Sequence, residues 1–155
     1  MRESRPNAWG RNFKGWHSDS KPGSHDGAYH REHTWTFQRT THNWELELPV
    51  SVYEYCTNRA RTQEYMQYLA DPLQDPFIDP LIERFEQLFE ESGLSRREQL
   101  DAVSQFVQAF DYSRDIQDTG HEIYPKYPIE TINHGKGDCE DGTILLGILL
   151  QRLGY

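Results

Sequence analysis

The segment 134–141, with the sequence HGKGDCED, contains residue types whose spacing could support thiol chemistry. Its glycines permit a sharp turn, Gly137 directly precedes the helix-capping residue Asp138, and Asp141 would complete a capping box. Cys139 would then lie in the first helical turn, where unpaired backbone N–H groups and the helix dipole favour a thiolate. The pattern predicts that Cys139 is a nucleophile and that its backbone N–H binds the oxyanion of an intermediate.

The charges around Cys139 work against this chemistry. Asp138, Glu140 and Asp141 place three carboxylates beside the thiol, and like charge disfavours its ionised form. The helix dipole contributes only about 1 kcal/mol, too little to overcome such neighbours. A reactive thiolate therefore needs a cation, normally an imidazolium. The alternative interpretation is an unreactive cysteine at a helix start, and local chemistry alone does not separate the two.

An upstream histidine could supply that cation. His134 lies five residues before Cys139, and His121 lies in the same segment, although a solvated loop histidine is the favoured interpretation of each. A metal site formed by Asp138, Cys139, Asp141 and His134 has poor ligand spacing. The sequence therefore predicts no metal and no cofactor.

The helix that would follow the capping residue is predicted over residues 138–153. Its apolar positions lie on more than one face, which indicates a centrally buried helix. These positions are Ile144, Leu145, Ile148, Leu149 and Leu150. The preceding segment 111–137 has no periodicity and holds several prolines and glycines. A loop of this length inside a domain is typically functional.

Residues 34–37 and 44–48 alternate apolar with polar residues and predict a β-hairpin with its turn at 40–43. One face of the hairpin is expected to be buried, and it carries Trp35, Phe37, Trp44, Leu46 and Leu48. A helical pattern begins at Val50, and Cys56 in this helix is expected to be a small packing residue.

Three further helical segments follow. A short one is predicted over residues 62–69, and the next is predicted to begin with Asp79 as N-cap and Pro80 at its first position, ending at Gly93. Ser95 opens the third with Glu98 as its capping-box partner, and an apolar face continues to Phe110.

Residues 1–30 are poor in aliphatic side chains and are predicted to form a disordered arm. Its histidines, with His33 just beyond, have irregular spacing and no accompanying cysteine, so solvated side chains are favoured over a metal site. They are His17, His25, His30 and His33. The remaining chain divides into residues 31–99, a hairpin with helices, and residues 100–155, which hold the Cys139 motif.

The composition limits the kinds of binding partner and the cellular compartment that are expected for this chain. A net charge of −9, with 25 acidic and 16 basic residues, opposes binding to nucleic acid. Two cysteines do not make a disulfide framework, which favours a reducing compartment. Neither a secretory signal nor an apolar run of about 20 residues is visible. A cytoplasmic protein without membrane association is therefore expected. Only 4 of the basic residues are lysine, which suggests a halophilic archaeal origin; stability unaffected by molar salt would contradict that hypothesis.

The last third of the chain resembles the transglutaminase-like superfamily, and more narrowly the bacterial and archaeal transglutaminase-like cysteine proteinase group. The resemblance covers about residues 100–155. It depends on residues 127–131 (YPIET), 135–141 (GKGDCED), 144–146 (ILL) and 149–155 (LLQRLGY). A Gly-Asp-Cys-Glu-Asp run before an aliphatic helix is specific, whereas each part alone is weak. The first hundred residues show no family motif.

The resemblance implies an α+β, papain-like fold in which the nucleophile helix packs against an antiparallel sheet. Cys139 matches the nucleophile, and Asn133 lies where a papain-type enzyme places a side-chain oxyanion donor. The family's catalytic His and Asp lie on strands C-terminal to this helix, and the sequence ends at Tyr155, so both residues and that sheet are expected to be missing. Gly137, Asp138 and Asp141 are expected to have structural roles.

The resemblance therefore implies attack of Cys139 on an amide carbonyl of a protein or peptide, through a thioester, by hydrolysis, cross-linking or deamidation. In this chain little activity is expected, because the base is missing. The alternatives are a non-catalytic interaction domain, or half of an enzyme completed by a partner chain or by self-association through the C-terminal helix.

Overall fold

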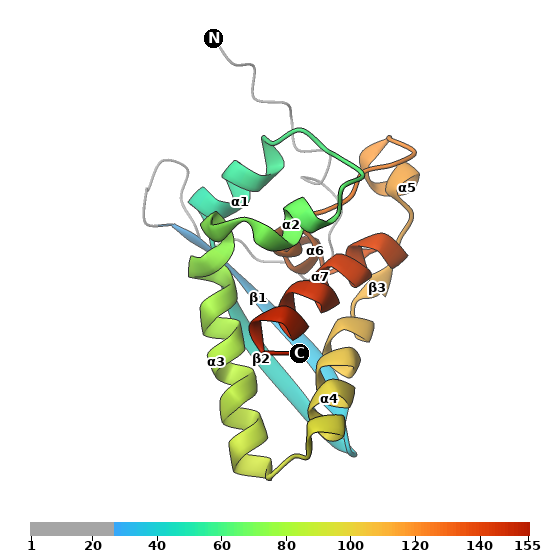
Figure 1. Cartoon of the computed structure of the whole chain (residues 1–155). Helices are drawn as coiled ribbons and strands as arrows, with labels where there is room; N and C mark the ends of the chain where they lie inside the picture. Colours follow the sequence, from blue (N-terminus) through green and yellow to red (C-terminus); the bar gives the residue numbers. More distant parts are fainter. Residues whose placement is uncertain (1–26) are drawn as a thin grey trace.

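A long antiparallel hairpin opens the described part of the chain, which covers residues 27–155 in a computed structural model (Figure 1). Strands β1 (Ala28–Phe37) and β2 (Thr40–Pro49) pair along their whole length. The two residues between them, Gln38 and Arg39, both have positive φ, as a two-residue type I′ turn requires. The predicted hairpin is confirmed, but its turn lies at 38–39, because the strands are longer than the alternating segments suggested.

The hairpin buries one face, as its alternation predicts. Trp35, Phe37, Trp44, Leu46 and Leu48 are all buried. Strand β1 also contains residues 28–30, so the predicted arm would end earlier than residue 30; residues 1–26, with His17 and His25, lie outside the described residues. The prediction of a solvated His33 is wrong: its ring is buried against Phe110, and its Nε2 lies 2.8 Å from the Phe106 carbonyl oxygen.

Helix α1 (Val50–Thr57) follows the hairpin, and its Cys56 is fully buried, which confirms the expected packing position. Next come α2 (Met66–Ala70) and the 3₁₀ turn η1 (Pro72–Gln74). Helix α3 (Asp75–Ser92) begins five residues earlier than predicted and contains Pro80. Pro76 is tolerated in its first turn, where N–H groups need no intrahelical partner.

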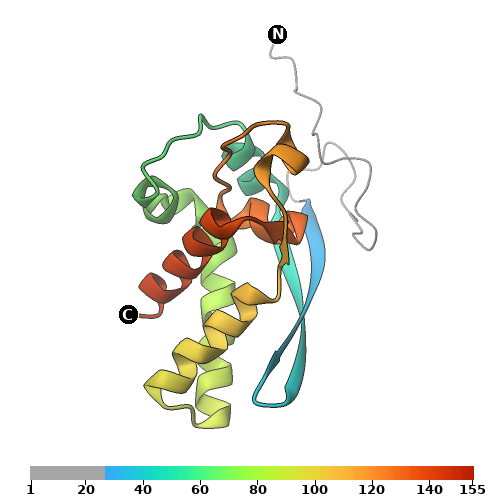
Figure 2. The ribbon, with the colours of Figure 1, turned by 90° about the vertical axis from the view of Figure 1, so that its right-hand side faces the viewer.

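The predicted helix ends were more accurate where caps are present. Gly93 ends α3 in the left-handed conformation at φ 60°. Ser95 and Glu98 form the predicted capping box of α4 (Arg96–Gln108). These two helices run along the hairpin, as Figure 2 shows from the side.

The segment 111–137 contains short regular elements, which its lack of periodicity concealed. They are β3 (Asp111–Tyr112), α5 (Asp115–Thr119), α6 (Pro128–His134) and β4 (Lys136–Gly137). Strands β3 and β4 pair in parallel. This pairing joins the end of α4 to the start of the last helix, α7 (Cys139–Arg152).

Helix α7 crosses in front of the hairpin and contacts α4, α6, α2 and α3 (Figure 1). Its residues Ile144, Leu145, Ile148 and Leu149 are buried, and Leu150 is half-buried, so central burial is confirmed. Helices of the same chain thus cover the apolar faces for which the resemblance implied a sheet. The result is a mixed α+β fold with a hairpin and several helices. No helix within residues 27–155 is long and apolar enough to cross a membrane.

Candidate thiol site at the start of helix α7

Cys139 is the first residue of α7, and its side chain is exposed. It lines a cavity of about 360 Å³ between the end of α4, the β3–β4 pair and the first turns of α7. The other lining residues are Val107, Gln108, Phe110, Asp111, Tyr112, Thr131, Gly137, Asp138, Gly142, Thr143 and Leu146. A cysteine at the edge of a concave, mainly apolar surface is in a position to meet a bound substrate.

The helix start has the capping box that the sequence predicted. Asp138 Oδ1 accepts hydrogen bonds from the N–H of Glu140 at 3.0 Å and of Asp141 at 3.1 Å. In return, Asp141 Oδ2 accepts from the Asp138 N–H at 3.1 Å. Two of the N–H groups expected at the helix start are therefore already occupied. Within residues 27–155, the N–H of Cys139 itself has no hydrogen-bond acceptor.

The turn before Cys139 requires glycine at Gly137. A Cβ atom there would lie 2.7 Å from the Asp141 Cβ, so any side chain would displace the capping residue. The same backbone is held from the other side, because the Ser113 N–H donates to the Gly137 carbonyl at 2.9 Å. The close approach fixes the path of the chain into α7, and it gives Gly137 a structural role.

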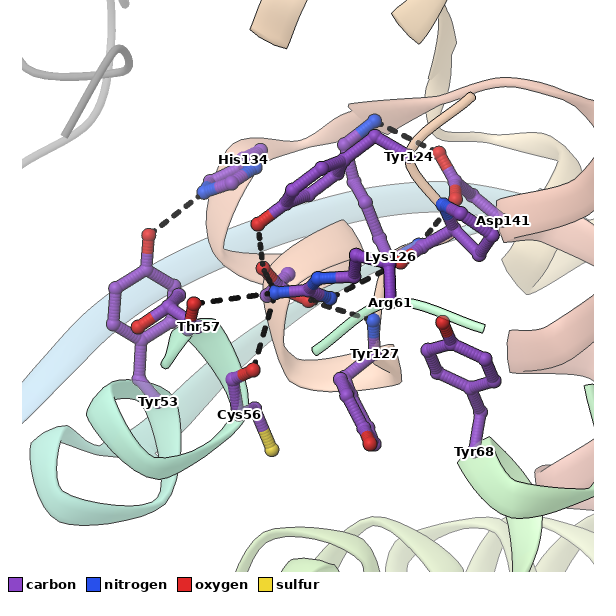
Figure 3. Close-up of polar contacts among 12 residues, drawn as sticks. Tyr53, Cys56, Thr57, Arg61, Tyr68, Tyr124, Lys126, Tyr127, His134 and Asp141 are labelled. Atoms are coloured by element: carbon purple, nitrogen blue, oxygen red, sulfur yellow. Dashed lines mark hydrogen bonds and ion pairs between the residues drawn. The ribbon is translucent and has the colours of Figure 1, made fainter. Parts of the chain in front are cut away.

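A buried lysine that the sequence interpretation missed anchors Asp141. Lys126 is fully buried, and its Nζ lies 2.8 Å from Asp141 Oδ2 (Figure 3). The Lys126 N–H also donates to Asp141 Oδ1 at 2.8 Å. Lys126 Nζ further lies 3.6 Å from Asp115 Oδ1 and 4.0 Å from Asp118 Oδ2. One cation thus lies among carboxylates from two helices, α5 and α7.

Negative charge remains in excess around this lysine. Burial raises the pKa of Asp115 to about 6, and burial also raises the pKa of Asp141, although Lys126 opposes that shift. Lys136 pairs with Asp118 at 2.6 Å. Two lysines therefore face five carboxylates, those of Asp115, Asp118, Asp138, Glu140 and Asp141. The sequence showed the three acidic residues next to Cys139, but not Asp115 and Asp118.

Three of these carboxylates could together hold a cation. Asp115, Asp138 and Glu140 each offer an oxygen, and these oxygens lie within 4.8 Å of one another. Oxygen ligands of this kind suit Ca²⁺ or Mg²⁺. The set differs from the one considered in the sequence, since neither Cys139 nor His134 belongs to it.

The histidines of the described chain do not line the cavity beside Cys139. His134 is buried, and its Nε2 lies 2.9 Å from the Tyr53 hydroxyl oxygen (Figure 3). Burial holds the pKa of His134 well below its usual value, so the ring is neutral at pH 7. His121 is exposed and stacks on Tyr124. Among residues 27–155, no histidine lines the cavity beside Cys139.

Asn133 is buried in α6, where its backbone carbonyl accepts from Arg31 Nε at 3.2 Å. It does not line the cavity, whereas Thr131, on the same helix, does. The structure thus brings Cys139, Asp138 and Gly137 together at the cavity but places Asn133 elsewhere.

A scan against protein-family models and searches of curated proteins and of solved structures found no match for this chain.

Proposed function

We propose that Cys139 is the nucleophile of a transglutaminase-like acyl-transfer or peptidase reaction on an amide carbonyl. The observation that carries this proposal is the Cys139 N–H, which has no acceptor within residues 27–155 and lies beside an exposed thiol and a cavity, at a helix start whose next two N–H groups are capped. A backbone N–H at the attacking residue can hold the oxyanion of the tetrahedral intermediate. The motif in residues 135–141 supports the same assignment.

In the proposed reaction, the Cys139 sulfur bonds to the carbonyl carbon and the C–N bond breaks. The thiol proton passes through a base to the leaving amine, and water or a second amine then releases the acyl group from the thioester. No histidine of residues 27–155 lines the cavity, so the base would come from outside these residues. The proposal therefore includes completion of the site by an imidazole from elsewhere in the protein or from a partner chain.

Acylation by p-nitrophenyl acetate tests the nucleophile without requiring a strong base. The rate of acetyl transfer to Cys139 is followed by intact-protein mass spectrometry over a range of pH and compared with N-acetylcysteine. At the high-pH plateau of the two rate profiles, we expect Cys139 to react about tenfold faster than the free thiol, because only Cys139 has the oxyanion donor beside it. A plateau rate no higher than that of the free thiol would overturn the proposal.

Matched variants show which cysteine is acetylated. Cys139→Ala removes the acetylation, and Cys56→Ala leaves it unchanged because Cys56 is buried. Hydrolysis of a test amide is expected to be negligible for the chain alone and to rise when imidazole is added to the Cys56→Ala variant. Gel filtration then shows whether the protein associates with itself, as completion by a second copy would require.

A further inference from the structure

The cavity beside Cys139 is lined mainly by apolar side chains. Val107 and Phe110 come from the end of α4, and Leu146 comes from the second turn of α7. Gly142, one helical turn after Cys139, lines it too, and a Cβ atom there would lie 3.9 Å from Val107 Cγ1. The volume of about 360 Å³ lies at the lower end of the roughly 300–1,000 Å³ of small-molecule sites. One side chain fits such a space better than an extended ligand does.

One lining residue has an unused polar group. Thr131 is 2 % exposed, and its Oγ1 is buried without a hydrogen-bond partner among residues 27–155. A buried hydroxyl without a partner is unfavourable, and such groups in native proteins are normally satisfied. Thr131 lines the cavity, and a polar atom of a bound ligand that reached its covered Oγ1 would supply the missing hydrogen bond.

The charge around the cavity limits the ligand further. Asp111 and Asp138 lie in its lining, and the chain has a net charge of −9. These carboxylates repel an anionic ligand and accept a neutral or cationic one.

We propose that this cavity is the subsite for the side chain of the acyl donor, and that it takes a neutral apolar group carrying one hydrogen-bonding atom, which pairs with Thr131. A phenol such as the tyrosine side chain has this chemistry. The proposal rests on Cys139 as the reactive thiol of the proposed function. It adds a specificity that neither the motif nor the thiol chemistry requires.

Affinity labelling of Cys139 tests the subsite without any catalytic turnover. Alkylation rates are measured for iodoacetamide and for its N-benzyl, N-(4-hydroxybenzyl) and N-(4-carboxybenzyl) derivatives, each divided by the rate with N-acetylcysteine. We expect the benzyl reagent to exceed iodoacetamide at least tenfold, because its ring is removed from water. The hydroxybenzyl reagent should be about three- to tenfold faster still, in line with one net hydrogen bond. The carboxybenzyl reagent should be the slowest of the three ring reagents.

Two variants separate the apolar and the polar contributions. Thr131→Val removes the hydroxyl and should abolish the advantage of hydroxybenzyl over benzyl. Gly142→Leu projects a side chain toward Val107 and should reduce both ring reagents to the iodoacetamide rate. Gly142→Ala adds only a Cβ atom at ordinary contact distance, so it should slow the ring reagents less than Gly142→Leu does.

Equal normalised rates for all reagents would overturn the subsite, and a benzyl rate that is unaffected by Gly142→Leu would do the same. A chemical-shift titration of the amide of Gly142 with N-acetyltyrosinamide and N-acetylphenylalaninamide repeats the comparison without thiol chemistry, and no shift with either ligand would also overturn it. Failure of the acetylation test with intact ring selectivity would instead reject the proposed function and leave the cavity as a binding site.

Discussion

The two cysteines lie in contrasting regions of the molecule. Cys56 in α1 is fully buried, and burial raises the pKa of its thiol to about 12. Cys139 is exposed at the start of α7 and lines a cavity. The same residue type is thus a packing residue in one region and an accessible thiol in the other. Burial, which the residue type does not determine, is the main difference.

A buried ion pair lies near each cysteine, and the two pairs differ in charge balance. Arg61 donates to both carboxylate oxygens of Glu130, at 2.5 and 2.9 Å, and also to the Cys56 carbonyl (Figure 3). Tyr124 and Tyr127 complete the hydrogen bonds of Glu130. Near Cys139, by contrast, Lys126 has several carboxylates around it. A balanced pair indicates a structural role, and the acidic excess lies beside the proposed site.

The largest expected difference is in thiol reactivity. In the native protein, iodoacetamide should modify Cys139 faster than Cys56 by a factor on the order of 10³ or more, because Cys56 reacts only after the core opens. Peptide mass spectrometry of a labelling time course measures both rates. In guanidinium chloride the two rates should converge; comparable rates without denaturant would contradict the contrast between the two regions.

Breaking the balanced pair should be strongly destabilising. Arg61→Met leaves Glu130 as a buried, uncompensated carboxylate, for which a loss of about 3–5 kcal/mol in unfolding free energy is expected. Urea denaturation measures the loss, and labelling of Cys56 should accelerate with it. Arg152→Met is the control, because Arg152 and Asp75 form a more exposed pair worth about 0–1 kcal/mol. Equal losses in the two variants would show that Arg61 has no special role.

The acidic excess predicts a specific pH dependence of stability. Asp115 has a folded pKa of about 6, against 3.8 as its ordinary value, so its protonation favours the folded state. That contribution is complete below about pH 4 and is lost as pH rises through about 6. Asp115→Asn removes the titration, so the stability of the variant relative to wild type should increase by about 2 kcal/mol between pH 4.5 and 7.5.

Urea denaturation at a series of pH values gives this difference, in which titrating groups that do not interact with Asp115, such as the buried histidines, cancel. Asp101→Asn, at an exposed position, is the control and should give a flat difference. A flat difference for Asp115→Asn as well would mean that burial does not raise the pKa of the Asp115 carboxyl.

The smallest effect concerns the carboxylates next to Cys139. Asp138→Asn keeps a capping side chain but removes a charge, so alkylation of Cys139 by iodoacetamide at pH 7 should become about threefold faster. The gain should shrink in 1 M salt, where charge is screened within about 3 Å. A rate that does not change would show that the flanking carboxylates do not restrain the thiol, and that a cation is less necessary than the sequence suggests.

Local patterns predicted the parts of the fold that depend on neighbours in sequence. The alternation around Trp35 and Trp44 predicted the hairpin, and the capping boxes at Ser95 and Asp138 predicted two helix starts, because these hydrogen bonds span three residues. The start of α3 was missed, since Pro80 is tolerated inside the helix. The sequence predicted a solvated His33, although its ring packs on Phe110, which is 77 residues away.

The sequence by itself determined the cap at Asp138, the glycine turn before it and the position of Cys139 in the first turn of α7, since each follows from residues within a few positions of one another. Only the tertiary structure decided that Lys126 lies beneath Asp141, that Thr131 rather than Asn133 lines the cavity, and that His134 is turned toward Tyr53. These are contacts between separate elements, and the packing of α6, α7 and the intervening loop selects them. Residue type and local spacing cannot specify such contacts, because many partners are chemically equivalent until the chain is folded.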